Sequence, residues 1–274
     1  MGIPYAEVIG DPVAHSKSPL IHRFWLGRLG IEGDYRSTRV TTDKLAMFLA
    51  ARRDDPDWRG CNVTLPHKQK VAPLLNERRT YATDAVNCVV PEEGRLIGFN
   101  TDSSAVGIAI DSGVDTKVPV CVVGAGGAAS AAVASLDILA VYQFNIIARD
   151  RGKGGRLVEP YGEYGRVYGF DQAAEALRNG AALINASPLG MEGFDPMPES
   201  VLAGLGGLAS DAFVMDMVYV PVRTDLLRQA AQHGLRTVDG LTMLIAQARE
   251  SFRYFFGMPA PLGHDSELRE LLTR

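Results

Sequence analysis

The stretch between Lys117 and Ser130 holds the pattern that is most readily tied to chemistry. A run of mostly β-branched residues leads into Gly124, Gly126 and Gly127, and an alanine-rich segment follows. This order predicts a buried strand, a tight turn and the start of a helix. Gly124 would permit the turn, Gly126 would let the main chain approach a pyrophosphate, and the free N–H groups of the helix would bind the phosphates. The stretch therefore predicts a dinucleotide site.

A charged loop after the next apolar run bears on which dinucleotide binds. Arg149, Arg151 and Lys153 surround Asp150 in this loop. A carboxylate here accepts a hydrogen bond from the ribose 2′-hydroxyl and favours NAD, whereas an arginine pairs with a 2′-phosphate and favours NADP. Three cations against one carboxylate favour NADP, and Asp150 leaves NAD as the alternative. Without the preceding glycines, a charged surface turn would be the better interpretation.

Two polar stretches earlier in the chain could serve a substrate. Asn62 and Thr64 lie on an expected strand, and the turn after it presents Lys68. Most lysines are solvated surface charges, so Lys68 alone indicates little. His67 has no second histidine or cysteine at metal-ligand spacing, which argues against a metal site. Residues 100–102, Asn-Thr-Asp, are suited equally to capping a helix and to a functional role.

Alternating strands and helices are expected to position these groups. In the amino-terminal part, strands are expected over residues 5–10, 34–40, 60–65, 84–90 and 95–99. Helices are expected over residues 21–29, over 44–53 with Asp43 as cap, over 71–75 after Pro66, and from 100–102 to Ile110. This alternation predicts a mostly parallel sheet with helices on its faces.

From residue 118 onward a second alternating series begins. Strands are expected over 118–123, 144–148, 166–170, 182–185, 213–217 and 236–238, with flexible loops at 152–155 and 192–199. The series resembles a doubly wound dinucleotide-binding unit. Two carboxy-terminal helices, over 241–254 and 265–274, could return to pack on the first part. We therefore expect an α/β protein with two α/β domains, one at residues 1–104 plus 240–274 and a doubly wound Rossmann domain at 105–239.

Composition excludes several classes of partner. The net charge of −4 and the lack of a lysine or arginine run argue against a nucleic-acid surface. Cys61, Cys88 and Cys121 are widely spaced in apolar surroundings, which predicts buried free thiols in a reducing compartment. The amino terminus does not resemble a signal peptide, and no apolar run approaches transmembrane length. We expect a cytoplasmic protein without a membrane partner.

Motifs spread from about Ile9 to Gly257 occur in the order found in shikimate dehydrogenases, and the chain resembles that family. They lie at residues 10–19, 62–68, 85–87, 100–102, 124–129, 185–191 and 239–247. The resemblance implies reversible reduction of 3-dehydroshikimate to shikimate with NADPH, a step in the synthesis of chorismate and the aromatic amino acids. It also implies that the discontinuous domain binds substrate and the Rossmann domain binds NADP.

The same resemblance implies roles for individual residues. Lys68 and Asp102 match the family's catalytic pair, in which the lysine can protonate the developing alkoxide and the aspartate orients the ammonium. Residues matched to substrate contacts are Ser16 and Ser18 for the carboxylate, Thr64, Asn87 and Gln247 for the ring hydroxyls, and Tyr219. Residues matched to the cofactor site are Gly124, Ala125, Gly126, Gly127, Ala128, Arg149, Asp150, Arg151, Ser187, Met217 and Gly240.

Two alternatives stay open at this point. Ala148, Arg149 and Asp150 replace the Asn-Arg-Thr pattern of the family, which leaves a quinate/shikimate dehydrogenase or a paralogue that uses NAD. A non-catalytic dinucleotide-binding regulatory protein could use the same fold. The retained Lys68 and Asp102 argue against that second alternative, because a binding protein needs no proton donor. The partner in each case is a small molecule, and the chain could be a monomer or a homodimer.

Overall fold

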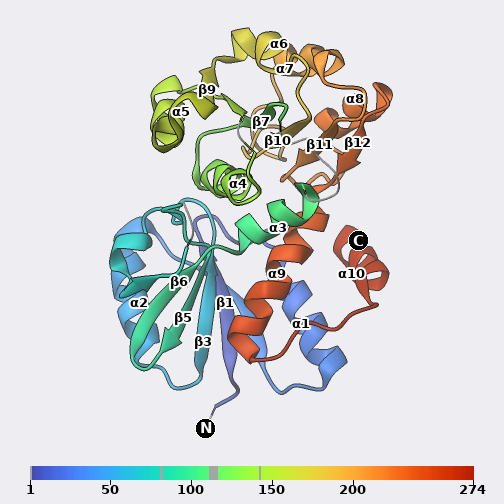
Figure 1. The fold of residues 1–274 in the computed structure, drawn as a ribbon. Helices are drawn as coiled ribbons and strands as arrows, with labels where there is room; N and C mark the ends of the chain where they lie inside the picture. Colours follow the sequence, from blue (N-terminus) through green and yellow to red (C-terminus); the bar gives the residue numbers. More distant parts are fainter. Residues whose placement is uncertain (1, 81–82, 111–116, 142) are drawn as a thin grey trace. The chain divides into compact units, whose positions relative to one another are not determined.

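The computed structural model describes residues 2–80, 83–110, 117–141 and 143–274. These residues divide into two compact units, each built around a six-stranded sheet (Figure 1). The first unit comprises Met1–Thr101 and Ile245–Arg274, and the second comprises Asp102–Leu244. In the described part of the chain, no helix combines the length and apolar character needed to cross a bilayer.

The sheet of the first unit is mixed, with strand order β2-β1-β3-β5-β6-β4. Its strands are β1 (Tyr5–Gly10), β2 (Asp34–Arg39), β3 (Trp58–Val63), β4 (Glu77–Arg78), β5 (Cys88–Glu92) and β6 (Arg95–Phe99). β1 runs parallel to β2 and β3, whereas β5 is antiparallel to β3 and β6. A turn joins β5 to β6, with positive φ at Glu93 and Gly94. The antiparallel hairpin makes this sheet less parallel than expected, and the short β4 was not predicted.

Helices cover both faces of this sheet. They are α1 (Ser18–Leu29), α2 (Leu45–Arg53) and α9 (Gly240–Phe256), while α10 (Asp265–Thr273) packs against α1. Along β1, Tyr5 and Ile9 face the cluster that holds Leu45 of α2, while Ala6 and Val8 face the cluster that holds Phe255 of α9. This alternation follows the two-residue period of a strand, and it sets α2 on one face and α9 on the other.

Three local predictions in this unit were wrong. Asp43 does not cap α2, because a 3₁₀ turn, η1 (Thr42–Lys44), precedes the helix and Lys44 is its N-cap. The helix expected at 71–75 is only the 3₁₀ turn η2 (Ala72–Leu74), in which Pro73 disfavours a longer helix. Strand β5 begins at Cys88 instead of residue 84, so Asn87 precedes the strand.

The sheet of the second unit is wholly parallel, with order β12-β11-β10-β7-β8-β9. Its strands are β7 (Val120–Val123), β8 (Phe144–Ile147), β9 (Gly165–Tyr168), β10 (Ala182–Asn185), β11 (Phe213–Asp216) and β12 (Arg236–Val238). All six predicted strands are present. The order reverses between β7 and β10, which is the arrangement of a doubly wound dinucleotide-binding sheet.

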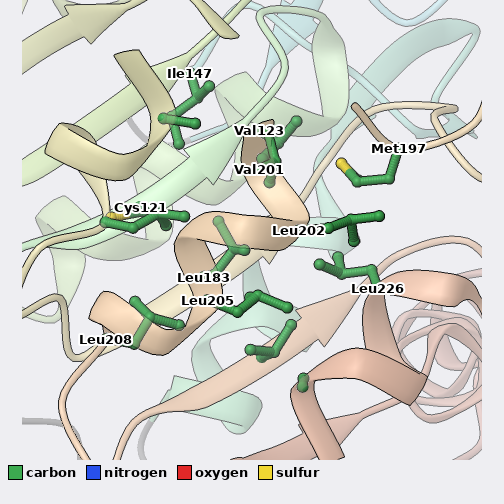
Figure 2. Close-up of a cluster of buried hydrophobic side chains, with 14 of the residues drawn as sticks. Cys121, Val123, Ile147, Leu183, Met197, Val201, Leu202, Leu205, Leu208 and Leu226 are labelled. Atoms are coloured by element: carbon green, nitrogen blue, oxygen red, sulfur yellow. The ribbon is translucent and has the colours of Figure 1, made fainter. Parts of the chain in front are cut away.

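The helices of this unit are α3 (Thr101–Ile110), α4 (Gly127–Ile138), α5 (Arg151–Val158), α6 (Ala173–Ala176), α7 (Glu199–Ala203) and α8 (Asp225–Gln232), with 3₁₀ turns η3 (Glu159–Tyr164), η4 (Phe170–Gln172) and η5 (Gly204–Gly207). Figure 2 shows the apolar cluster to which Cys121 of β7, Leu183 of β10 and Val201 of α7 belong. Residues 152–155 form part of α5 and are not the loop that their glycines predicted.

Candidate active site

The turn after β7 is the tight glycine turn that the sequence predicted. Gly124 has a φ of 115°, a conformation that favours glycine. A Cβ atom at Gly124 would lie 2.9 Å from the carbonyl oxygen of Ala186, which is too close for a real side chain. The N–H group of Gly124 donates to the carbonyl of Ile147 at 2.9 Å. These contacts fix the turn at the carboxyl ends of β7, β8 and β10.

The start of α4 is open to an anion. Gly126 is its N-cap, and an ideal Cβ atom at Gly126 would meet no heavy atom within 4 Å. The first N–H groups of any α-helix lack acceptors within the helix, and glycine offers no side chain to cap them. Ala129 is fully buried, where the motif needs a small residue. The turn therefore fits the pyrophosphate of a dinucleotide.

The side chain of Asp150 caps the amino end of a helix. It is the N-cap of α5, and its Oδ1 accepts from the N–H of Lys153 at 3.0 Å. That backbone hydrogen bond is the main reason that the pKa of Asp150 lies below its usual value. Arg149 is 85% exposed, with Nη1 3.8 Å from Oδ2 of the exposed Asp195. Among the side chains that bear on cofactor choice, Arg149 projects into solvent, whereas Asp150 caps α5.

The loops after β10 and β11 are tied together by Asn185 and Asp216. Asn185 Nδ2 donates to Asp216 Oδ1 at 2.9 Å, and Asn185 Oδ1 accepts from the Ser187 hydroxyl at 2.7 Å. Asp216 Oδ2 accepts from Thr224 Oγ1 at 2.6 Å. Burial raises the pKa of Asp216, and the hydrogen bond from Thr224 opposes that rise. Sequence reasoning did not assign Asn185 or Asp216, which support the predicted cofactor residue Ser187.

Two further predicted residues of the second unit lie against each other. A Cβ atom at Gly240 would lie 2.3 Å from the carbonyl oxygen of Val218 and 2.8 Å from that of Met217. Only glycine permits so close an approach of α9 to this loop. Tyr219 follows directly, and burial raises the pKa of its hydroxyl, which therefore remains a neutral donor around pH 7.

In the first unit, predicted substrate residues meet around Thr101. Asn87 Oδ1 accepts from the N–H of Thr101 at 2.7 Å, and Asn87 Nδ2 donates to Thr101 Oγ1 at 3.0 Å. Thr101 Oγ1 lies 3.3 Å from Gln247 Oε1 of α9. Asn87, Thr101 and Gln247 are all buried. Asn87 and Gln247 are predicted site residues, whereas Thr101 is not, because its position at the start of a helix is equally suited to a cap.

Tyr35 connects this group to the serine loop. Its hydroxyl donates to Asn62 Oδ1 at 2.6 Å, and Asn62 Nδ2 donates to the carbonyl of Asn87 at 3.2 Å. The Ser18 hydroxyl lies near that of Tyr35, where it lowers the pKa of Tyr35 against the larger effect of burial, and Ser16 Oγ accepts from the N–H of Ser18 at 3.3 Å. Hydrogen bonds thus join Tyr35, Asn62 and Asn87, and Ser18 lies beside them. Tyr35 carried no sequence signal, since an aromatic residue on a strand is most often core.

The ring of Tyr35 stacks on the ring of a buried histidine. The ring of His22 in α1 lies parallel to that of Tyr35, with centroids 4.0 Å apart and planes 6° apart. Both ring nitrogens of His22 are buried and have no hydrogen-bond partner among the described residues. Burial lowers the pKa of His22 to about 3, so the ring is neutral at pH 7. Burial likewise keeps the pKa of Tyr35 well above its usual value.

Lys68 and Thr64 flank the turn after β3. The N–H of Thr64 donates to the carbonyl of Ile9 at 2.9 Å, and the carbonyl of Lys68 accepts from the N–H of Val86 at 2.8 Å. The second bond sets Lys68 beside the segment that bears Asn87. His67 between them is a buried structural residue, with Nε2 2.6 Å from the carbonyl oxygen of Val40.

Asp102 is 5% exposed in the first turn of α3.

Cys61, Cys88 and Cys121 are buried free thiols, as predicted, and burial raises the pKa of each. Within the described ranges, no group of three or more histidine, cysteine, aspartate or glutamate side chains is placed to hold a metal ion.

Comparison with protein families and curated proteins gives matches along the chain. Residues 8–89 match the shikimate dehydrogenase substrate binding domain, and residues 240–264 match the shikimate 5′-dehydrogenase C-terminal domain. A relative from Sphingopyxis alaskensis named shikimate dehydrogenase (NADP(+)) is 47% identical over 275 residues, covering 98% of this chain and 97% of the relative.

Solved structures give the same picture. Shikimate 5-dehydrogenase from Thermus thermophilus, in complex with NADP(H) and shikimate, superposes with a TM-score of 0.82 at 32% identity, covering 98% of each chain. Quinate dehydrogenase from Corynebacterium glutamicum, in complex with NAD, superposes with a TM-score of 0.81 at 27% identity, again covering 98% of each chain. Because it matches both family domains and is 47% identical to one relative over 98% of its length, the chain belongs to the shikimate dehydrogenase family.

Proposed function

We propose that the protein is an NADP-dependent shikimate dehydrogenase, which catalyses the reversible reduction of 3-dehydroshikimate to shikimate in the synthesis of chorismate and the aromatic amino acids. The observation that supports this most strongly is the 47% identity, over 98% of the chain, with a relative named for that activity and that cofactor. The local geometry of both units is compatible with it.

The second unit would hold the cofactor. The open start of α4 after Gly126 suits a pyrophosphate, and Gly124, Ala125, Gly127 and Ala128 complete that turn. Arg149 would pair with the 2′-phosphate, with Arg151 beside it, because arginine presents a planar fork of donors that matches phosphate. When bound, the nicotinamide supplies a hydride to the ketone carbon of the substrate. Ser187, Met217 and Gly240 belong to the loops that would line the rest of this site.

The first unit would hold the substrate. A small acid with several hydroxyl groups needs many fixed polar contacts. Ser16 and Ser18 would bind its carboxylate, and Thr64, Asn87 and Gln247 would bind its ring hydroxyls. The hydrogen-bond network through Tyr35 and Thr101 supports this assignment, because it fixes the orientation of uncharged donors and acceptors before substrate arrives. Tyr219 would add a further contact.

Lys68 would be the general acid. As the ketone oxygen gains charge, the Lys68 ammonium gives it a proton and becomes a neutral amine; in the reverse direction the amine accepts that proton from the hydroxyl of shikimate. Asp102 would accept a hydrogen bond from the ammonium and orient it. The residue types suit the task, since a lysine amine can both give and accept the proton.

Steady-state rates with four pairs of substrates test the proposal. Shikimate and quinate are each oxidised with NADP⁺ and with NAD⁺, and the expected highest kcat/KM belongs to shikimate with NADP⁺. A clear preference for NAD⁺ or for quinate would replace the proposal with the activity that the Corynebacterium glutamicum protein is named for. Binding of either dinucleotide without turnover of either acid would instead point to a regulatory protein.

We also infer a cytoplasmic enzyme whose partners are its small-molecule ligands. The three buried free thiols support a reducing compartment. Whether the enzyme is a monomer or a homodimer is decided by its mass in light scattering at working concentration. A particle larger than a dimer would contradict both alternatives.

A further inference from the structure

Lys17 occupies a position that its local structure does not explain. It lies between Ser16 and Ser18 and is the N-cap residue of α1, where its side chain makes no capping hydrogen bond. Helix N-caps favour serine, threonine, aspartate or asparagine, and the positive end of the helix dipole disfavours a nearby cation. A lysine here therefore has a reason outside α1.

That reason lies at the opposite end of the sequence. The Lys17 ammonium donates to the carbonyl oxygen of Leu272, 255 residues further along the chain. Leu272 belongs to the last turn of α10, where carbonyl groups accept no hydrogen bond from within the helix. A cation is favoured at this negative end of a helix. The side chain that is misplaced on α1 is thus well placed on α10.

Helix α10 offers a firm anchor. Leu268 and Leu272 are fully buried, and α10 packs against α1. A second contact, an ion pair, joins Arg28, in the last turn of α1, to Glu267, in the first turn of α10. The two contacts join opposite ends of the helices, so α1 and α10 run antiparallel. Lys17 joins the two helices beside Ser16 and Ser18, and Arg28 joins them at the opposite end of α1.

The loop that Lys17 anchors is held otherwise by short-range bonds. The N–H of Ser16 donates to the carbonyl of Val13 at 3.1 Å, and Ser16 Oγ accepts from the N–H of Ser18 at 3.3 Å. These contacts shape the turn but connect residues close together in the chain. The bond from Lys17 relates the turn to a buried helix and so fixes the two flanking hydroxyls in space.

We propose that Lys17 is a positioning residue, which holds the Ser16 and Ser18 hydroxyls for the substrate carboxylate by anchoring their loop to the carboxyl end of α10. The inference rests on the proposed function, since it takes those serines as the carboxylate site. Its ammonium is engaged by the main chain of α10, so it acts through the serines and does not pair directly with the carboxylate.

The first experiment is steady-state kinetics of Lys17→Met, which keeps the apolar stem and removes the donor. We expect KM for shikimate to rise about tenfold, the usual effect of losing a hydrogen bond from a charged group. The kcat and the KM for NADP⁺ should stay within about twofold of wild type. Lys17→Arg restores a cationic donor and should recover most of the affinity. Arg28→Met removes the equivalent contact at the far end and should leave KM for shikimate unchanged.

The second experiment separates anchoring from direct binding. A chain that ends at Leu271 lacks the acceptor carbonyl, and Leu272→Ala is its matched control, because it loses the buried side chain but keeps that carbonyl. Lys17→Met in the shortened chain should raise KM no further than either change alone. Multiplied effects would mean that Lys17 meets the carboxylate itself and would overturn the proposal.

Hydrogen exchange of the amides at 16–18 provides a readout without substrate. Lys17→Met should exchange faster there than wild type, whereas Arg28→Met should not. Unchanged exchange together with unchanged KM would refute the anchor even if the shortened chain fails to fold. A wild-type protein inactive on shikimate would refute the proposed function instead, and the exchange measurement would still decide whether Lys17 orders the loop.

Discussion

The two units hold their polar groups in different ways. In the first, Tyr35, Asn62, Asn87 and Thr101 are buried and hydrogen-bond to one another across several elements. In the second, the cluster to which Leu183 and Val201 belong is apolar, and the hydrogen-bonded residues Asn185 and Asp216 are the last residues of β10 and β11. The ring hydroxyls of a small acid require fixed, uncharged partners, whereas phosphates are bound by main-chain N–H groups and an exposed cation. The contrast suggests that each proposed ligand has shaped the interior of its own unit.

The strongest challenge to this contrast is Lys68→Ala, which removes the charged group proposed for the first unit. We expect kcat to fall by about 10²–10⁴, the usual span for losing a positioned general acid. Lys70→Ala is the matched control, because Lys70 is an exposed lysine whose Nζ donates to Thr42 Oγ1 at 3.0 Å. Turnover close to wild type in a folded Lys68→Ala protein would remove this residue from the mechanism.

The buried ring of His22, which packs against Tyr35 in the first unit, makes the stability of the folded protein depend on pH. Its pKa of about 3 in the folded protein lies below the ordinary 6.5, so the unfolded chain takes up a proton first as pH falls. The folded state therefore loses stability between pH 6.5 and 3. His22→Phe keeps a ring beside Tyr35, and its stability advantage over wild type should widen by about 1.4 kcal/mol per pH unit in that window. Parallel stability curves in urea titrations from about pH 7 to about pH 4 would contradict this assignment.

Arg149→Ala addresses the second unit alone. Loss of the 2′-phosphate partner should raise KM for NADP⁺ about tenfold, as expected for a hydrogen-bonded charge, with little change for NAD⁺. The KM for shikimate should not move. Arg166→Ala, a change at an exposed arginine of β9 in the same unit, serves as the control. An equal effect on both dinucleotides would show that Arg149 does not read the 2′-phosphate.

The smallest expected effect belongs to Tyr35→Phe, which cuts the network of the first unit but keeps the ring on His22. We expect KM for shikimate to rise roughly fivefold, the effect of one neutral hydrogen bond, with little change in kcat or in KM for NADP⁺. Tyr5→Phe removes another hydroxyl of this unit, which donates to Asp55, and should leave KM unchanged. A shift in cofactor affinity with Tyr35→Phe would break the division of labour between the units.

Sequence patterns were more informative for the second unit than for the first. Parallel strands buried on both faces appear as short apolar runs, so all six strands of the second sheet were found. In the first unit, the two-residue β4 is too short for a pattern, and the antiparallel pairing of β5 with β3 depends on residues distant in sequence. The glycines at 152–155 suggested a loop, but the cap at Asp150 and the packing of Gly154 against Val167 leave them helical.

The candidate site was predicted as a set of residues but not as a network. Ser16, Ser18, Asn87 and Gln247 were named through motifs, and their local contacts now support a common site. Tyr35 and Thr101, which join them, could not be found in this way, because a hydrogen bond between strands leaves no periodic trace in a sequence. The roles of Lys68 and Asp102 remain predictions that the kinetic experiments address.

The cap at Asp150 has a consequence for how cofactor preference can change in evolution. A dehydrogenase that shifts from NADP to NAD needs a carboxylate free to meet the ribose, and this chain already has one at the expected place. That carboxylate, however, begins α5. A mutation that released Asp150 would weaken the helix before it improved NAD binding, so a second substitution would first have to supply another cap. A change of cofactor preference therefore depends on the stability of α5, and a substitution that reverses the charge at position 149 is not sufficient, because Asp150 still caps the helix.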